Sequence, residues 1–265
     1  RFATIVAGIV AKDGLDGLVI STILAGIFLI LMGLCHFGSL IKFIPYTITT
    51  GFTSGIAVTI VIGQLKDFFG VTYPNGLKPI ETMEKLNAFA LGFSSFHVDA
   101  LIVGGVSLAI LIISPYIFKR IPGSLIAVVI GILMVKFLPL HVSTIGNLYT
   151  ITNDLPSFHI PAVKFSMVKS AIPNAFTIAV LAAIESLLSC VVADGMINGK
   201  HRSDTELVAQ GLGNIASALF GGIPATGAIA RTAANIKNGG RTPVAGMVHS
   251  ITLVIVLVVL MPFAG

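Results

Sequence analysis

The sequence predicts an all-α, polytopic membrane protein in which one helix is broken inside the bilayer. Hydrophobic residues make up 55% of the 265 residues and charged residues only 10%, whereas soluble domains carry about 25% charged residues. Apolar runs of roughly 20 residues, the length that crosses a bilayer as a helix, recur along the chain. The stretch Phe220–Gly246 interrupts this pattern with glycines, prolines and an arginine. We therefore expect a multi-pass protein of the cell membrane.

The first part of the chain is expected to hold the end of one helix and two complete spans. Residues 1–11 are apolar, and the charged residues Lys12, Asp13 and Asp16 after them predict a solvated turn. The segment that follows the second span is polar and bears glycine and proline, which predicts a loop. The two spans and this loop are Leu18–His36, Phe43–Leu65 and 67–95.

Five more helices are expected in the rest of the chain. Pro122 occupies the favoured first-turn position of one of them, and the prolines of 139–170 predict a second extramembrane segment. Asp204 is a candidate helix cap, and Glu206 lies in the first turn of the same helix, where acidic side chains are stabilised. The predicted helices are Val98–Phe118, Pro122–Leu138, Ile172–Met196, Asp204–Phe220 and Pro243–Pro262.

Composition and motifs exclude several classes of function. The net charge of +5 is spread thinly without a basic cluster, which argues against nucleic acid as a partner. The chain lacks the H-E-x-x-H, G-x-S-x-G and P-loop motifs, so no enzyme is predicted. Cys35 and Cys190 lie in apolar segments, where a small buried hydrophobe is the expected role, and their spacing predicts neither a metal site nor a disulfide. No cofactor is implied.

The interrupted segment predicts an anion site. Gly221, Gly222 and Pro224 lead into a helix that is too short to cross a bilayer and is expected to begin near Thr226. The free N–H groups at such a start carry about half a positive charge, and broken helices build anion sites in transporters in this way. A cap, a glycine that lets a ligand approach, three free amides and a cation would then form the site: Thr226, Gly227, Ala228, Ile229, Ala230 and Arg231.

Glu185 lies almost at the centre of the predicted span 172–196. An ionised carboxylate there costs at least a few kcal/mol if it is unpaired. The functional interpretation is a proton- or cation-coupling site that faces a cavity, and the alternative is a structural hydrogen bond to a neighbouring helix. Arg231 is a candidate partner, because an ion pair would lower the cost of both charges.

Four polar side chains are candidates for supporting roles. Ser189 lies one turn after Glu185 on the same face, and Asn235 lies one turn after Arg231. Gln210 and Asn214 share a face of the helix 204–220 and are expected to form hydrogen bonds between helices rather than to bind a ligand. Ser186, although adjacent to Glu185, is expected to point elsewhere.

An internal repeat of opposite topology is also predicted. Residues 1–40 combine a helix end, a short loop and a long span, and residues 225–262 combine a half-helix, a polar turn and a long span. Transporters built from inverted repeats carry one broken helix in each half. A second half-helix is therefore expected just before Arg1.

Several motifs resemble the sulfate permease (SulP) family of anion transporters. They are I-E-S at 184–186, E-L-x-x-x-G-x-x-N-I at 206–215, and G-G-x-P-x-T-x-x-x-x-R-T-x-x-N at 221–235. The resemblance covers essentially the whole chain. Within the family, the phrases SGIAVTIVIGQLKDFFG, AAIESLLSCVVADGMINGKH and GAIARTAAN are similar to bacterial C4-dicarboxylate transporters of the DauA type.

The resemblance implies part of a seven-plus-seven inverted-repeat fold with core and gate domains. This chain would run from about the end of the third helix to the eleventh, without the first and last helices or the cytoplasmic STAS domain. The family's anion lies between the starts of the third and tenth helices, which assigns Thr226–Arg231 to the tenth-helix half. Glu185 matches the acid that is linked to proton coupling. Many members carry serine where this chain has Ala230, so backbone amides must contribute more.

The resemblance and the residues together predict secondary active transport of an anion by elevator-like alternating access. The expected substrate is sulfate or a C4-dicarboxylate such as succinate, coupled to protons or to sodium, in a full-length protein that forms a homodimer in the lipid bilayer. One alternative is an uncoupled, channel-like conductor of chloride or bicarbonate on the same fold. The other is a sensory or structural membrane module without flux.

Overall fold

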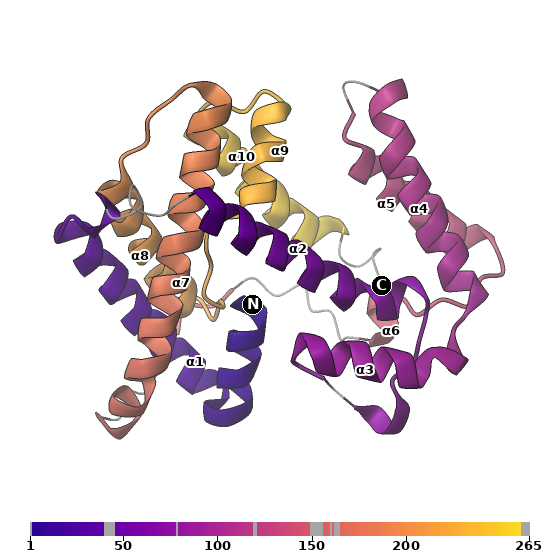
Figure 1. Ribbon diagram of the computed structural model, residues 1–265, viewed down its shortest axis with the longest axis horizontal. Coiled ribbons are helices and arrows are strands. Elements are labelled where there is room, and N and C mark those ends of the chain that lie inside the picture. Colours follow the sequence, from indigo (N-terminus) through magenta and orange to yellow (C-terminus); the bar gives the residue numbers. More distant parts are fainter. Residues whose placement is uncertain are drawn as a thin grey trace. The chain divides into compact units, whose positions relative to one another are not determined.

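The structure, a computed structural model, describes residues 2–39, 46–77, 79–118, 121–148, 156–159, 161 and 165–260. All regular secondary structure in these ranges is helical, as predicted (Figure 1). The chain divides into two compact units. Unit 1 comprises Arg1–Thr53 and Asp154–Val258, and unit 2 comprises Ser54–Asn153 and Val259–Gly265.

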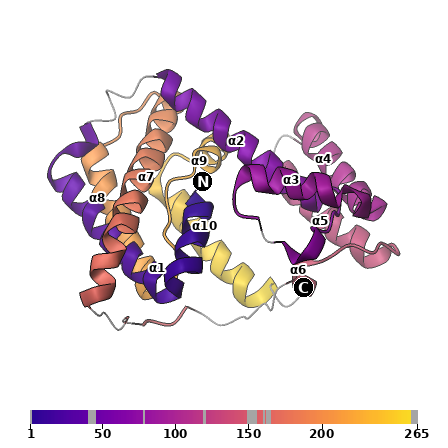
Figure 2. The same cartoon turned by 60° about the horizontal axis from the view of Figure 1, so that its bottom comes forward.

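Unit 1 is built mainly from helices that are far apart in the sequence. Helix α1 packs along both α7 and α8, and α7 also contacts α8 and α9. The views in Figures 1 and 2 both show α1, α7 and α8 side by side. These helices are α1 (Phe2–Leu34), α7 (Phe165–Ile197), α8 (Ser203–Leu219), α9 (Ile229–Lys237) and α10 (Pro243–Ile255), which continues as a π-helical turn, Val256–Leu260.

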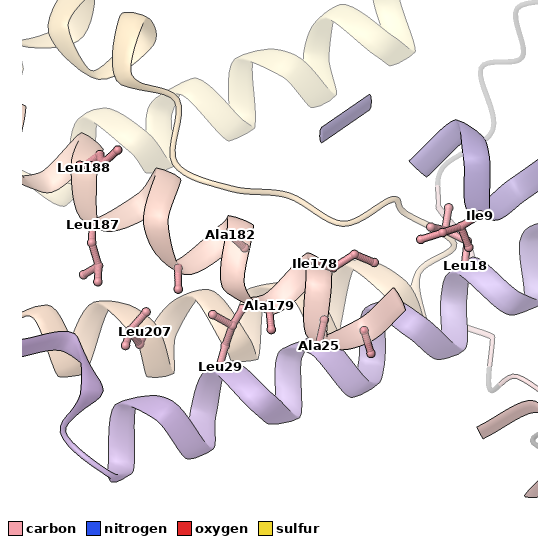
Figure 3. Packing of buried hydrophobic residues seen from close by; sticks show 12 residues of the cluster. Ile9, Leu18, Ala25, Leu29, Ile178, Ala179, Ala182, Leu187, Leu188 and Leu207 are labelled. Atoms are coloured by element: carbon pink, nitrogen blue, oxygen red, sulfur yellow. The ribbon is translucent and has the colours of Figure 1, made fainter. Parts of the chain in front are cut away.

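Helix α1 consists of two helical pieces that meet at Gly14. The backbone there has φ 72° and ψ −174°, a conformation that only glycine adopts readily because it lacks a Cβ. Ile9 before the break and Leu18 after it belong to the same buried cluster (Figure 3). The turn predicted around Lys12–Asp16 is therefore confirmed.

The core of unit 1 lies where α1, α7 and α8 meet. Leu187 of α7 and Leu207 of α8 point toward one another, and Leu29 of α1 lies below Ala179 and Ala182 (Figure 3). The buried face of α7 carries small residues, which let neighbouring helices approach closely. Its fully buried alanines are Ala175, Ala179 and Ala182.

Helices α1 and α8 approach each other through glycines. A Cβ added to Gly26 would lie 2.7 Å from the Gly211 carbonyl oxygen, and one added to Gly211 would lie 2.5 Å from the Gly26 carbonyl oxygen. Real Cβ atoms do not come this close to backbone atoms. The two helices therefore contact each other backbone to backbone, as close-packed membrane helices do.

We expect Gly211→Ala to destabilise the protein by about 1–3 kcal/mol, because the added methyl group would force α1 and α8 apart. Gly213→Ala is the matched control, since a Cβ there meets nothing within 4 Å and alanine favours the helix. Thermal unfolding of the detergent-solubilised protein measures both. Equal melting temperatures for the two variants would contradict the glycine contact.

Unit 2 contains a hairpin of two apolar helices, α4 and α5. These two helices pack against each other. The rings of Phe69, Phe89 and Phe93, which precede α4 in the sequence, contact one another and form an aromatic cluster. The elements are α2 (Tyr46–Phe68), which begins in unit 1, then η2 (Pro74–Gly76), α3 (Thr82–Gly92), η3 (Phe93–Ser95), α4 (Val98–Ile117), α5 (Gly123–Phe137) and α6 (Ile145–Leu148).

Three described helices are long and apolar enough to cross a membrane: Ile5–Leu34, Val98–Ile117 and Met167–Ile197. They match three of the predicted spans. Helices α5 and α10 are apolar but shorter, and α2 follows the predicted span Phe43–Leu65 as far as the structure describes it. The predicted ends at Phe43 and Pro262 lie outside the described residues.

The structure corrects three predictions about helix positions. The segment 67–95, predicted as a loop, contains α3, which begins with a capping box between Glu81 and Glu84. Helix α7 begins at Phe165 rather than Ile172 and continues through Pro173. Asp204 does not cap α8; its carboxylate instead accepts hydrogen bonds from the Gly38 N–H and the His36 Nδ1, both at 2.9 Å.

Candidate functional site

The broken segment connects α8 to a short helix through an extended stretch of chain. Helix α8 ends at Leu219, Gly221 has φ 72°, and α9 begins only at Ile229. The start predicted near Thr226 is three residues too early. The N-cap residue is Ala228 without a side-chain cap, and the Thr226 hydroxyl lies 3.3 Å from the Gly227 carbonyl oxygen instead. We call residues 221–228 the extended segment.

Polar side chains of α7 and α8 hold the backbone of the extended segment. The Ser217 hydroxyl donates to the Ile223 carbonyl oxygen at 2.9 Å. Asn214 accepts from the Ala225 N–H at 2.8 Å and donates to the Ala225 carbonyl oxygen at 2.9 Å. Ser186 accepts from the Gly227 N–H at 3.0 Å. The segment therefore obtains from side chains the hydrogen bonds that a helix would supply internally.

The Gln210 side chain joins this network. Its Nε2 donates to the Ser186 hydroxyl oxygen at 2.5 Å, which ties α8 to α7. Asn214 is almost completely buried, with 1% of its surface exposed, and it also donates to the Gln210 carbonyl oxygen. The interpretation of Gln210 and Asn214 as structural hydrogen-bonding residues agrees with this geometry, although Asn214 bonds to the extended segment rather than to a second helix.

The start of α9 leaves backbone donors free. Its first internal bond runs from the Thr232 N–H to the Ala228 carbonyl oxygen at 2.9 Å. Within the described part of the chain, no acceptor is assigned to the N–H groups of Ala228, Ile229, Ala230 or Arg231. Such unpaired donors, together with the helix dipole, favour an anion at this position. Arg231 lies in the same first turn with an exposed side chain.

Glu185 lies half-buried on α7 and interacts with the Thr226 hydroxyl of the extended segment. Of the two roles considered for Arg231, the ion pair with Glu185 is not formed: the salt bridges found among the described residues all join histidine to aspartate. Arg231 therefore retains its charge for another partner. The proposed coupling acid and the proposed anion site nevertheless meet at one place, because Thr226 leads directly into the start of α9.

The two candidate supporting residues, Ser189 and Asn235, both form hydrogen bonds within unit 1. The Ser189 hydroxyl lies 2.8 Å from the Thr232 hydroxyl and joins α7 to α9 instead of bonding to Glu185. Asn235 lies near the end of α9, where its carbonyl oxygen accepts from the Gly240 N–H at 2.9 Å. Its side chain packs against Gly240, so it supports the turn that ends the helix.

Ser186 is the residue that the sequence did not single out. The backbone of Gly227 approaches it closely, next to Thr226, which contacts Glu185. A Cβ at Gly227 would lie 2.9 Å from the Ser186 Cα and 3.3 Å from the Ser189 Cβ. The signal that could have found it is the stripe of small residues along α7, which leaves room for another backbone.

Comparison with known proteins identifies the family to which the chain is similar. The model of the sulfate permease family matches residues 2–265. The protein of Bacillus subtilis named "Putative sulfate transporter YvdB" is 41% identical over 270 residues, covering 100% of this chain and 50% of the relative. The bicarbonate transporter BicA of Picosynechococcus is 36% identical over 247 residues, covering 91% of this chain and 43% of the relative.

Solved structures show the same fold. The transmembrane domain of a cyanobacterial bicarbonate transporter BicA aligns with a TM-score of 0.80 at 30% identity, over 98% of this chain and 67% of that one. Murine Slc26a9 in the inward-facing state aligns with a TM-score of 0.75 at 21% identity, over 95% of this chain and 42% of that one, a likeness of fold alone.

These relatives qualify one expectation, the narrower resemblance within the family. They are named for sulfate and bicarbonate, which does not support the narrower resemblance to DauA-type C4-dicarboxylate transporters. The chain also spans only about half the length of the curated relatives that it matches.

Proposed function

Because the chain belongs to the sulfate permease family, we propose that it forms part of the membrane domain of a secondary active transporter for a small inorganic anion, sulfate or bicarbonate. It is a multi-pass membrane protein of a transporter family rather than an enzyme. The observation that carries the proposal is the start of α9, where four backbone N–H groups and Arg231 have no assigned acceptor among the described residues.

The start of α9 suits a small oxyanion. Backbone N–H groups, the helix dipole and a guanidinium all favour negative charge, and hydrogen bonds to charged groups contribute about 1.5–3 kcal/mol each. Ala228 and Ala230 leave space for the ligand, and Ala230 offers no side-chain donor. Recognition in this half of the site therefore rests on the backbone N–H groups of Ala228–Arg231 and on the Arg231 side chain.

Glu185 is proposed as the coupling group. Its carboxylate lies beside Thr226, and an ionised carboxylate repels an anion bound at the start of α9. A proton or a sodium ion at Glu185 would remove this repulsion and let the site cross the bilayer with less net charge. Reciprocal linkage then makes the bound cation favour the anion and the anion favour the cation.

We further propose that the chain covers the end of the third helix to the eleventh helix of a seven-plus-seven inverted repeat. Two parts of unit 1 share one plan: a helical piece, a glycine at positive φ and a longer helix. In α1 the glycine is Gly14, and between α9 and α10 it is Gly239 with φ 93°. This similarity supports an inverted repeat. Alternating access of elevator type and assembly of the full-length protein as a homodimer are proposed on the family resemblance alone.

Uptake by proteoliposomes containing the full-length transporter tests the proposal. Labelled sulfate, bicarbonate and succinate are supplied separately, with and without an inward gradient of protons or of sodium. We expect saturable uptake of sulfate or bicarbonate that one of the gradients accelerates. Uptake of succinate alone would restore the dicarboxylate prediction, and uptake that no gradient affects would favour an uncoupled conductor. Absence of all uptake would contradict transport.

A further inference from the structure

Three side chains outside the proposed anion site fix the backbone that leads into it. Ser186 of α7 and Gln210 and Asn214 of α8 form a continuous set of hydrogen bonds with the extended segment. We call these three residues the polar clasp. Its members are buried or half-buried, so water competes little for these bonds.

The polar clasp binds the residues on both sides of Thr226. Asn214 engages both the N–H and the carbonyl oxygen of Ala225, and Ser186 engages the N–H of Gly227. Because both neighbours of Thr226 are bound through their backbone, the path of the chain at Thr226 is fixed. The clasp thereby determines where the Thr226 hydroxyl meets Glu185.

The fit of Gly227 against α7 leaves little freedom for another arrangement. The Gly227 backbone is so close to Ser186 that even a methyl group would collide with the helix. Gly227, which donates to Ser186, is only two residues before the start of α9 at Ile229. The first turn of α9 therefore follows directly from the bound segment. A change at Ser186 would therefore move the free N–H groups of α9.

We propose that Ser186 and Asn214 are positioning residues of the anion site, which hold the start of α9 and Thr226 at a fixed place relative to Glu185. This inference rests on the proposed function. Neither residue need touch the anion, because both act through the backbone at Ala225 and Gly227. Loss of either contact should weaken anion binding more than it slows the transport cycle.

Uptake kinetics of the full-length transporter in proteoliposomes test the inference with Ser186→Ala. We expect the KM for sulfate or bicarbonate to rise about tenfold, the effect of one lost hydrogen bond to a preorganised site, while the maximal rate per reconstituted protein changes less than about twofold. Ser217→Ala is the matched control, since Ser217 also bonds to the extended segment but at Ile223, farther from Thr226. An unchanged KM in Ser186→Ala would overturn the inference.

Hydrogen exchange followed by mass spectrometry supplies a second readout that needs no substrate. Peptides covering 223–232 should exchange faster in Ser186→Ala than in Ser217→Ala or the unmodified protein. Equal exchange rates would overturn the inference even if the unmodified protein transported no tested anion, whereas absent transport alone would contradict only the proposed function.

If Ser186→Ala fails to fold, Gln210→Ala is the milder variant, because it removes a donor to Ser186 without touching the segment. It should raise the KM by a smaller factor, and an unchanged KM and exchange rate would again overturn the inference.

Discussion

Replacing Arg231 with alanine is expected to raise the KM for the transported anion about 100-fold, which corresponds to ~2.7 kcal/mol. Arg231 lies in the first turn of α9, beside backbone N–H groups that lack an assigned acceptor. A charged donor contributes about 1.5–3 kcal/mol to a hydrogen bond with an anion. No described carboxylate forms a salt bridge with Arg231, so its charge remains available to the substrate. Uptake at increasing anion concentration in proteoliposomes measures the effect.

Two further variants test whether the effect depends on the position and geometry of the positive charge or only on the net charge of the helix. Arg231→Lys keeps the charge but not the planar fork of donors, and we expect it to recover part of the affinity. Lys237→Ala removes a cation from the last turn of the same helix, where the dipole disfavours an anion, and should leave the KM nearly unchanged. A similar loss in Arg231→Ala and Lys237→Ala would show that Arg231 acts only through net charge.

Replacing Glu185 with glutamine is expected to abolish acceleration of anion uptake by the coupling gradient. Glutamine matches the size and hydrogen-bonding capacity of the protonated acid but neither releases a proton nor offers sodium a charged ligand. It can still bond to Thr226, so the contact with the extended segment is preserved. Uptake with a gradient should therefore fall to the level measured without one, while exchange of labelled for unlabelled anion continues.

The control is a second acid of the same helix. Asp194 lies near the end of α7 and accepts hydrogen bonds from the N–H and the Nδ1 of His201, at 3.0 and 2.7 Å. Asp194→Asn preserves an acceptor and should keep gradient-driven uptake. If Glu185→Gln accumulated anion as the unmodified protein does, Glu185 would have only a structural role and another group would carry the coupling. Transport by Glu185→Gln that is unchanged when no gradient is present would favour the uncoupled conductor.

Part of the architecture was predictable because lipid imposes simple rules on sequence. Long apolar runs must become helices, since backbone groups in hydrocarbon have to be bonded within their own segment. The spans around α1, α4 and α7 followed from this rule, and so did the break between α8 and α9. The helix α3 was missed because its polar, glycine-bearing surroundings resemble a loop, although Glu81 and Glu84 carry the capping signal.

The details of the candidate site depended on neighbours that the sequence does not place. Helix α9 starts three residues later than predicted, because Asn214 and Ser186 supply hydrogen bonds that keep 225–227 extended. Ser189 bonds to Thr232 rather than to Glu185, and Arg231 has no described carboxylate partner. Periodicity says which residues share a helix face, but not which other element that face meets.

The sequence by itself determined that this protein is helical, lies in a membrane, and carries a glycine- and proline-broken helix with one arginine at its start. Those features follow from local composition, because hydrocarbon tolerates few polar groups and a cluster of two glycines and a proline at 221–224 disfavours a continuous helix. Only the tertiary structure decided which side chains hold the broken segment and which acid faces it. Such contacts join residues about 11 to 41 positions apart, and their geometry exists only once α7, α8 and α9 are packed together.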